Sequence, residues 1–227
     1  MRMGRMGRFV LALVAPCLLA SCLLTPGRFT STLDIRKDRS FTFTYAGEAI
    51  LLDPAAEMNS SPSTEDGDAP KAAPTPKVET GDEIAKRRAI AEALAKEVGY
   101  RSAEYLGGGK FRVDYALSGT LDRGFVFPFN GDAGAIVPWV AVEVRRDGTA
   151  RVKAPAFGKE TSPNDMGVSP DKDGMKERAG SFTFTTDAEL LMQNNESGTA
   201  PGPGTKVVWE VTPTSQTVPT AVVRFAK

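Results

Sequence analysis

The sequence predicts an α+β fold, in which a mostly antiparallel sheet of short strands is accompanied by one main helix. Short segments with alternating apolar and polar residues recur along the chain and are separated by turn residues. Only residues 84–98 combine a helical spacing of apolar residues with a capping signal in front of them. Many strands with a single helix are typical of α+β domains rather than of parallel α/β folds.

The predicted helix follows Thr80-Gly81-Asp82-Glu83, which has the form of a capping box. Gly99 is well suited to the position after its last turn. The apolar side of the helix consists of Ile84, Ile90, Ala91, Leu94, Ala95 and Val98. A helix with one such side packs that side against the sheet.

A hairpin is expected near the start, with strands at 29–35 and 40–45 and a polar turn at Lys37-Asp38-Arg39-Ser40. Residues 49–52 either continue the second strand or begin a short helix. Asp147-Gly148 is the strongest hairpin signal in the chain, and Gly107-Gly108-Gly109 indicates another turn rather than a phosphate loop. Further strands are expected at 100–106, 110–117, 124–129, 139–144, 149–152, 182–186, 206–211 and 220–225.

Residues 53–79 differ from the rest because they are rich in Pro, Ser, Ala and acidic residues. Such a composition predicts a disordered, mobile insert. A linker between two domains is the alternative, but the chain before it is too short to form a core of its own. We therefore expect a single domain over residues 29–227 that contains this insert.

The N-terminus has the pattern of an export signal. Arg2, Arg5 and Arg8 precede an apolar run at 9–20. As a helix that run is about 18 Å long, too short for the ~30 Å hydrocarbon core of a bilayer. It ends in Leu19-Ala20-Ser21-Cys22, which resembles the lipobox of bacterial lipoprotein precursors. An ordinary signal peptide with a chance cysteine, or a short uncleaved anchor, is the alternative.

The lipobox predicts that residues 1–21 are removed and that Cys22 is lipidated, with residues 22–28 as the lipidated N-terminus. The membrane is then a partner through acyl chains on Cys22, such as palmitate. Leu23 in place of Asp after the cysteine favours the outer membrane, facing the periplasm, if the cell has two membranes. Lys+Arg and Asp+Glu both number 28, so no basic excess indicates nucleic-acid binding.

The composition also restricts the chemistry. The chain has no histidine, and its two cysteines are Cys17 and Cys22. Ser-His-Asp and Cys-His catalysis are therefore excluded, and zinc or redox-metal sites are not expected. We expect no catalytic, cofactor-binding or metal-binding residues and thus no enzyme. A cell-envelope hydrolase that uses carboxylates or a Ser–Lys pair is the alternative.

Aromatic residues at alternate strand positions are the remaining feature. They are Phe41, Phe43, Tyr45, Phe111, Tyr115, Phe125, Phe127, Phe129 and Trp139. They are expected to fill the core between sheet and helix, as is Trp209. The alternative is that a curved sheet and the helix enclose an apolar pocket.

The order of these features resembles the bacterial LppM-type lipoprotein domain and uncharacterised Gram-negative envelope lipoproteins. A lipobox cysteine, a hairpin at 33–43, a capped helix, an Asn195-Glu196-Ser197-Gly198 turn and a strand at 206–211 occur in that order. The acidic insert and the hairpin around Asp147-Gly148 depart from the pattern. The resemblance implies a helix-grip-like sheet, no catalytic residues, and an envelope role in binding or assembly with a lipid, another apolar ligand or a protein as partner.

Overall fold

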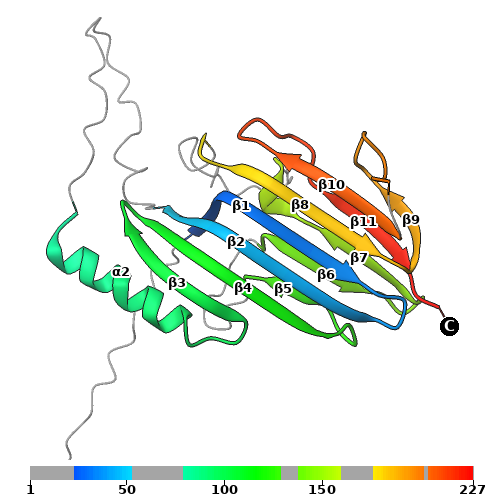
Figure 1. Ribbon diagram of the computed structural model, residues 1–227, viewed down its shortest axis with the longest axis horizontal. Helices are drawn as coiled ribbons and strands as arrows, with labels where there is room; N and C mark the ends of the chain where they lie inside the picture. The colour runs from blue at the N-terminus through cyan, green and yellow to red at the C-terminus, as the bar shows by residue number, and fades with distance from the viewer. Residues whose placement is uncertain (1–22, 53–78, 129–137, 160–175, 202–203, 227) are drawn as a thin grey trace, which may run out of the picture.

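The structure, a computed structural model, describes residues 23–52, 79–128, 138–159, 176–201 and 204–226. Eleven strands, one α-helix and one 3₁₀ turn make up these segments (Figure 1). In chain order they are β1 (Leu23–Ile35), β2 (Ser40–Leu52), α2 (Gly81–Leu94), β3 (Tyr100–Gly107), β4 (Lys110–Thr120), β5 (Phe125–Phe127), β6 (Val140–Val144), β7 (Thr149–Lys153), η1 (Pro155–Phe157), β8 (Ala179–Thr186), β9 (Glu189–Gln193), β10 (Thr205–Val211) and β11 (Thr220–Arg224).

The strands form two sheets that lie face to face. The larger has the strand order β10-β8-β1-β2-β4-β3 and the smaller β5-β6-β7-β11-β9. Every pairing is antiparallel except that of β1 with β8. The prediction of a mostly antiparallel β structure with one main helix is therefore confirmed. The expectation of one sheet of short strands was wrong, because the strands are divided between two sheets and β1 and β2 have 13 residues each.

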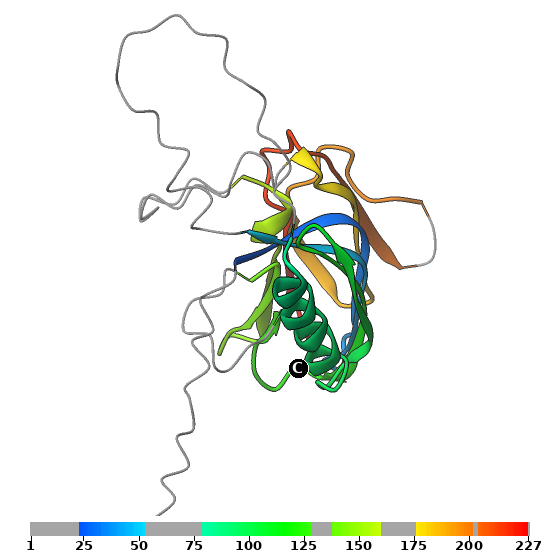
Figure 2. The same ribbon diagram turned by 90° about the vertical axis from the view of Figure 1, so that its left-hand side faces the viewer.

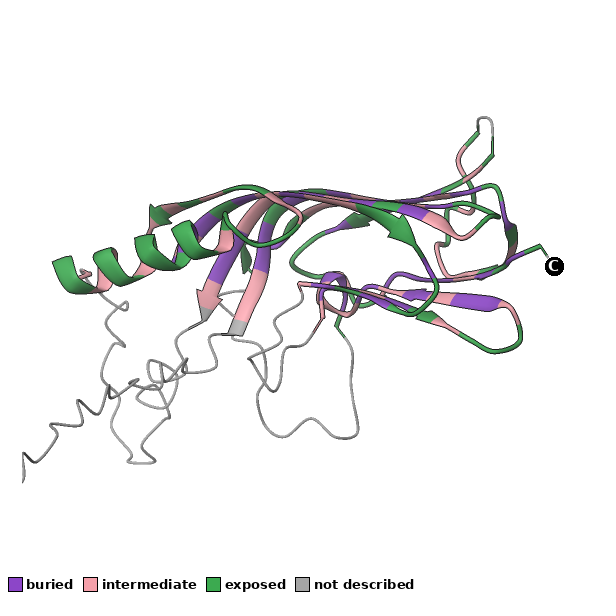
Figure 3. Ribbon diagram, turned by 90° about the horizontal axis from the view of Figure 1, so that it is seen from below, coloured by how far each residue is buried: buried purple, intermediate pink, exposed green. Residues whose placement is uncertain are grey.

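The core lies between the two sheets and not between a sheet and the helix. Figure 3 shows buried residues in the strands of both layers and a largely exposed α2 at one end. Phe127 of β5 joins the layers, with its ring centroid 5.0 Å from that of Phe43 and 4.6 Å from that of Tyr115. Both sheets carry an apolar face, so each can cover the other. In α2, by contrast, Ala91 is the one buried residue.

Local signals placed most elements correctly. The capping box at Thr80 and Glu83 is present, but α2 spans Gly81–Leu94 instead of 84–98, and Val98 beyond its end is 80% exposed. β2 continues to Leu52, which decides between strand and helix for residues 49–52. The turn before it places Arg39 at a φ of 70°, a conformation that glycine adopts more easily. β9 is a strand that the sequence pattern did not reveal.

Several predictions fall on residues outside the described segments. These are the signal peptide at 1–21, Cys22, residues 53–78 of the insert, and Phe129. β1 already begins at Leu23, so a regular strand includes residues 23–28, which are part of the predicted lipidated N-terminus. The strand thus starts directly after the cysteine.

Candidate functional site: an apolar pocket beside α2

An apolar pocket lies at the end of the molecule where α2 packs beside β3, an edge strand of the larger sheet. Ile90 and Leu94 of α2 form one wall. The larger sheet supplies six lining residues, which are Leu24, Ala49, Leu51, Tyr100, Phe111 and Val113, and the remaining lining residues are Phe127, Pro128 and Trp139. Figure 2 views the molecule from this end, with α2 in front of the two layers. The pocket therefore draws on both sheets and on the helix.

Trp139 connects this pocket to the start of β1. Its indole Nε1 donates a hydrogen bond to the carbonyl oxygen of Leu24 at 3.0 Å. Its ring centroid lies 5.1 Å from that of Tyr45 in the core. Trp139 is 3% exposed, so the bond is held in a well-packed environment. Leu24 is thereby fixed at the pocket wall.

The phenol groups near the pocket are neutral at physiological pH. Burial raises the pKa of Tyr100 to about 12 and also raises the pKa of Tyr115. The two rings meet edge to face, with centroids 5.0 Å apart. Gly99 makes this contact possible, because a Cβ at that position would lie 2.5 Å from the Tyr115 ring. No residue lining the pocket carries a formal charge.

The helix that forms one wall of the pocket buries little of its apolar surface. Ile90 is 36% exposed although it lines the pocket, and Leu94 is half-buried. Helices in proteins owe most of their stability to the packing of an apolar face. Because α2 packs so little of its surface, we expect it to be among the least stable elements of the described structure.

A polar cluster fixes the segment that leads into α2. The Glu79 carboxylate accepts hydrogen bonds from the Tyr105 hydroxyl and, at 3.0 Å, from the Gly108 amide, and it pairs with Arg87 of the helix. The Tyr105 hydroxyl in turn accepts from the Gly109 amide at 3.1 Å. These contacts tie the start of α2 to the β3–β4 turn.

The pocket as it stands is small. Its cavity has a volume of about 60 Å³. An engineered cavity of about 150 Å³ lined by apolar side chains in another protein is large enough to bind benzene. The pocket beside α2 thus has room for no more than the end of a hydrocarbon chain, and a longer ligand needs a wider pocket than the structure has.

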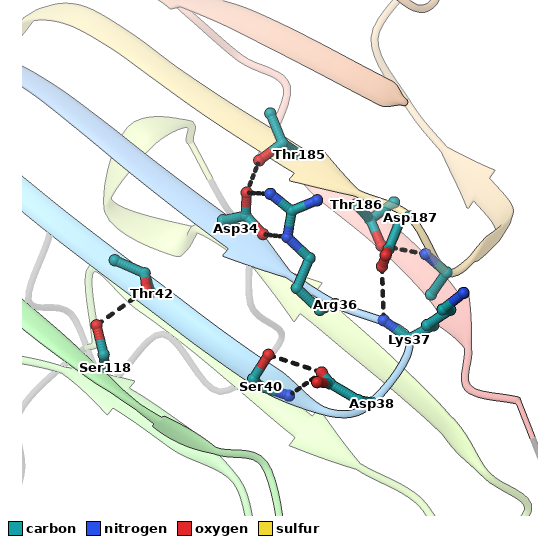
Figure 4. A network of polar contacts seen from close by, with 11 residues as sticks. Asp34, Arg36, Lys37, Asp38, Ser40, Thr42, Ser118, Thr185, Thr186 and Asp187 are labelled. Carbon is teal, nitrogen blue, oxygen red and sulfur yellow. Dashed lines mark hydrogen bonds and ion pairs between the residues drawn. The ribbon is translucent and has the colours of Figure 1, made fainter. Parts of the chain in front are cut away.

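A second group of polar side chains lies at the other end of the larger sheet, around the β1–β2 turn (Figure 4). Asp34 accepts from Thr185 at 2.8 Å and forms an ion pair with Arg36 at 2.7 Å. The Asp187 carboxylate accepts from the Lys37 amide at 2.6 Å. Each carboxylate is thus bonded to neighbouring side chains or backbone, and these contacts account for the shape of the turn.

The structure brings together many of the residues that the sequence singled out, but not around a chemical centre. Eight of the nine aromatic residues lie buried between the sheets or beside the pocket, and Trp209 is also buried. Within the described segments, no three Asp, Glu, His or Cys side chains are grouped as metal ligands would be. No local pattern predicts that Leu24, Leu51 and Pro128 meet at one pocket, because they are far apart along the chain. Cys22 is outside the described residues.

In the part of the chain that the structure describes, no helix is long and apolar enough to cross a membrane. No protein-family model and no curated protein sequence matches the chain. Among solved structures, the chain is similar to the NMR structure of the folded domain of Mycobacterium tuberculosis LppM. The similarity covers 90% of this chain and 93% of that chain, with a TM-score of 0.35 and 19% sequence identity. A TM-score of 0.35 is too low to support membership of a family, so the LppM-type family remains a prediction from the sequence.

Proposed function

We propose that this protein is a lipid-anchored, non-catalytic component of the bacterial cell envelope whose domain binds an apolar ligand beside α2. The pocket is the observation that carries the proposal. Its lining combines apolar side chains with a helix that buries little of its apolar surface as one wall. Ligand pockets are typically concave and mostly apolar.

The location follows from the N-terminus. The lipobox-like string Leu19–Cys22 supports acyl chains on Cys22, and Leu23 after it favours the outer membrane over the inner one in a cell with two membranes. A helix-grip-like description of the larger sheet belongs to the same proposal, since α2 packs beside β3 at the edge of this sheet and closes one side of the pocket.

The pocket favours binding over hydrolysis. A hydrolase of the kind considered above needs two carboxylates or a Ser–Lys pair beside its substrate. The eleven lining residues include no carboxylate, no lysine and no serine. Tyr100 is the one lining residue with an ionisable side chain, and it is protonated at neutral pH, since burial raises its pKa from the ordinary 10 to about 12.

Mass spectrometry of the full chain tests both parts of the proposal. Protein extracted from bacterial membranes should have the mass of a chain that starts at Cys22 and carries diacylglycerol and acyl groups, and Cys22→Ser should abolish that mass. Native spectra of the same protein should also contain a non-covalent apolar adduct. Loss of the adduct is expected in Ala49→Leu, which fills the pocket, but not in Ala46→Leu, which alters an exposed position of the same strand. An unlipidated chain would contradict the anchoring, and equal adducts in both variants would contradict the site.

A further inference from the structure

The pocket lies next to the residue that carries the predicted lipid. Leu24 lines the pocket, and its carbonyl oxygen is held by Trp139. Covalent geometry alone keeps the Cα atoms of Cys22 and Leu24 within about 7 Å of each other. The acyl chains on Cys22 must enter the hydrocarbon core of the membrane. The pocket is therefore confined to the immediate neighbourhood of the bilayer surface.

The dimensions of a bilayer convert the short distance between Cys22 and Leu24 into a depth for the pocket. Its headgroup layers together add about 10–15 Å to a hydrocarbon core of about 30 Å, so each layer is only some 5–8 Å thick. Two residues of extended chain span no more than one such layer. A pocket at this distance is at the depth of the lipid headgroups or directly above them.

The rim of the pocket is suited to that depth. Ile90 of α2 lines the pocket and is 36% exposed. Apolar side chains at the rim favour contact with the headgroup–acyl boundary over contact with water. The charges of α2 cancel, because Asp82, Glu83 and Glu92 balance its three basic residues. Attraction to anionic headgroups is therefore not what brings the rim to the membrane.

From these observations we propose that the pocket receives the acyl-chain end of a lipid directly from the bilayer in which Cys22 is anchored. This inference rests on the proposed function and adds the source and the chemical class of the ligand. The chain end enters between α2 and the larger sheet, and Ile90 and Leu94 move outward as it advances. A hydrocarbon chain that passes from the bilayer to the pocket has only the headgroup layer to cross, so the exchange needs no carrier.

The two tryptophans of the chain provide a matched test. Trp139 lines the pocket, whereas Trp209 is buried on β10, where it stacks on Phe182 and donates to Asn194 at 3.2 Å. The full-length lipidated protein is placed in vesicles of phosphatidylethanolamine and phosphatidylglycerol whose acyl chains carry bromine near the end. Bromine quenches tryptophan fluorescence at contact distance.

We expect Trp209→Phe, which retains Trp139, to lose most of its fluorescence in these vesicles, and Trp139→Phe, which retains Trp209, to lose little. The loss should be the same in high salt and should disappear when Ala49→Leu is added to fill the pocket. A loss that needs low salt, that persists with the filled pocket, or that is equal for both tryptophans would overturn the inference.

A second arm separates this inference from the proposed function. If brominated fatty acid in solution quenches Trp139 but brominated vesicles do not, the pocket binds chains from water and the inference fails while the proposed function stands. If neither quenches it, both fail. Should Trp209→Phe not fold, a lipid with a photoactivatable group at its chain end can be used with the wild-type protein. Cross-links are then expected at Ile90 and Leu94 and not at Leu191 and Met192, which are exposed apolar residues of β9.

Discussion

The core between the sheets and the end of the molecule beside α2 contain similar apolar side chains, but they pack very differently. Between the sheets Phe43 is 0% exposed and its ring lies 5.0 Å from that of Phe127. Beside α2, Ile90 is 36% exposed and borders a cavity. We therefore expect stability to be concentrated between the sheets, so that α2 can adjust around a ligand without unfolding the domain.

The largest expected effect comes from removing a core ring. Phe43→Ala should lower the free energy of unfolding by about 3–5 kcal/mol, because it deletes a fully buried aromatic side chain and leaves a cavity. Ile90→Ala is the matched variant at the other end and should cost less than about 1 kcal/mol, since that side chain is partly in water. Denaturation with guanidinium measures both. Equal losses would show that α2 is part of the same cooperative core.

The next effect is expected at a buried arginine that joins three loops. Arg178 is 2% exposed and donates to the carbonyl oxygens of Ala156 and Gly158 at 3.0 Å and of Ser215 at 3.2 Å. Its Nε has no hydrogen-bond partner among the described residues. Burial lowers the pKa of this guanidinium, but arginine remains charged in proteins.

Arg178→Met should cost about 2–4 kcal/mol, because it leaves several buried carbonyl groups without a donor. Arg178→Lys keeps the charge but cannot reach all of these carbonyls, so its loss should be intermediate. Guanidinium denaturation followed by circular dichroism checks both variants. If Met were tolerated as well as Lys, the loops would be held by packing alone. The difference in stability between the sheets and α2 would then come from the aromatic core and not from Arg178.

A smaller effect is expected in the turn between α2 and β3. Gly99 has a φ of 93°, and a Cβ there would press into the Tyr115 ring. Gly99→Ala should cost about 2 kcal/mol from backbone strain and the clash. Gly148 is the matched control, because its φ is 81° and an added Cβ would meet nothing within 4 Å. Gly148→Ala should therefore cost only about 1 kcal/mol. Thermal denaturation compares the two, and equal losses would exclude a steric role of Tyr115.

The same contrast explains how far the sequence could predict the molecule. Capping and turn signals are local, so the start of α2 and the hairpin at Gly148 were predicted correctly. The division into two sheets depends on pairings between distant segments, such as β1 with β8, which no local pattern encodes. β9 was missed because Glu-Leu-Leu-Met-Gln does not alternate and forms an edge strand.

The candidate pocket was predictable only in kind. In-phase aromatic residues indicated either a core or an apolar pocket, and both occur, with Phe127 in each. Its walls were not predictable, because Leu24 and Trp139 meet through the fold and their hydrogen bond joins residues 115 positions apart. The role of Glu79 was not predictable either. It stands at the end of an acidic segment, and nothing in the sequence distinguishes its carboxylate from the others as the one that contacts Tyr105, Gly108 and Arg87.

The smallest effect is expected at Glu79, and it tests whether α2 can open locally while the sheets stay folded. Glu79→Gln weakens the contacts to Tyr105, Gly108 and Arg87. The free energy of local opening of α2 should fall by about 1 kcal/mol, because these groups are partly exposed. Hydrogen exchange should therefore quicken for the amides of α2, while those of β2 and the global unfolding free energy stay unchanged.

The control for Glu79 is an ion pair on the neighbouring strands. Glu104 and Arg112 lie 3.7 Å apart and are both 66% exposed, so Glu104→Gln should leave exchange unchanged throughout. If Glu79→Gln also destabilised β2, α2 and the sheets would unfold as one unit. The helix could then not move aside for a ligand while the core stays folded, and a ligand longer than a chain end would have no way into the pocket. Faster exchange in α2 alone would instead mean that Glu79 sets how often the pocket opens.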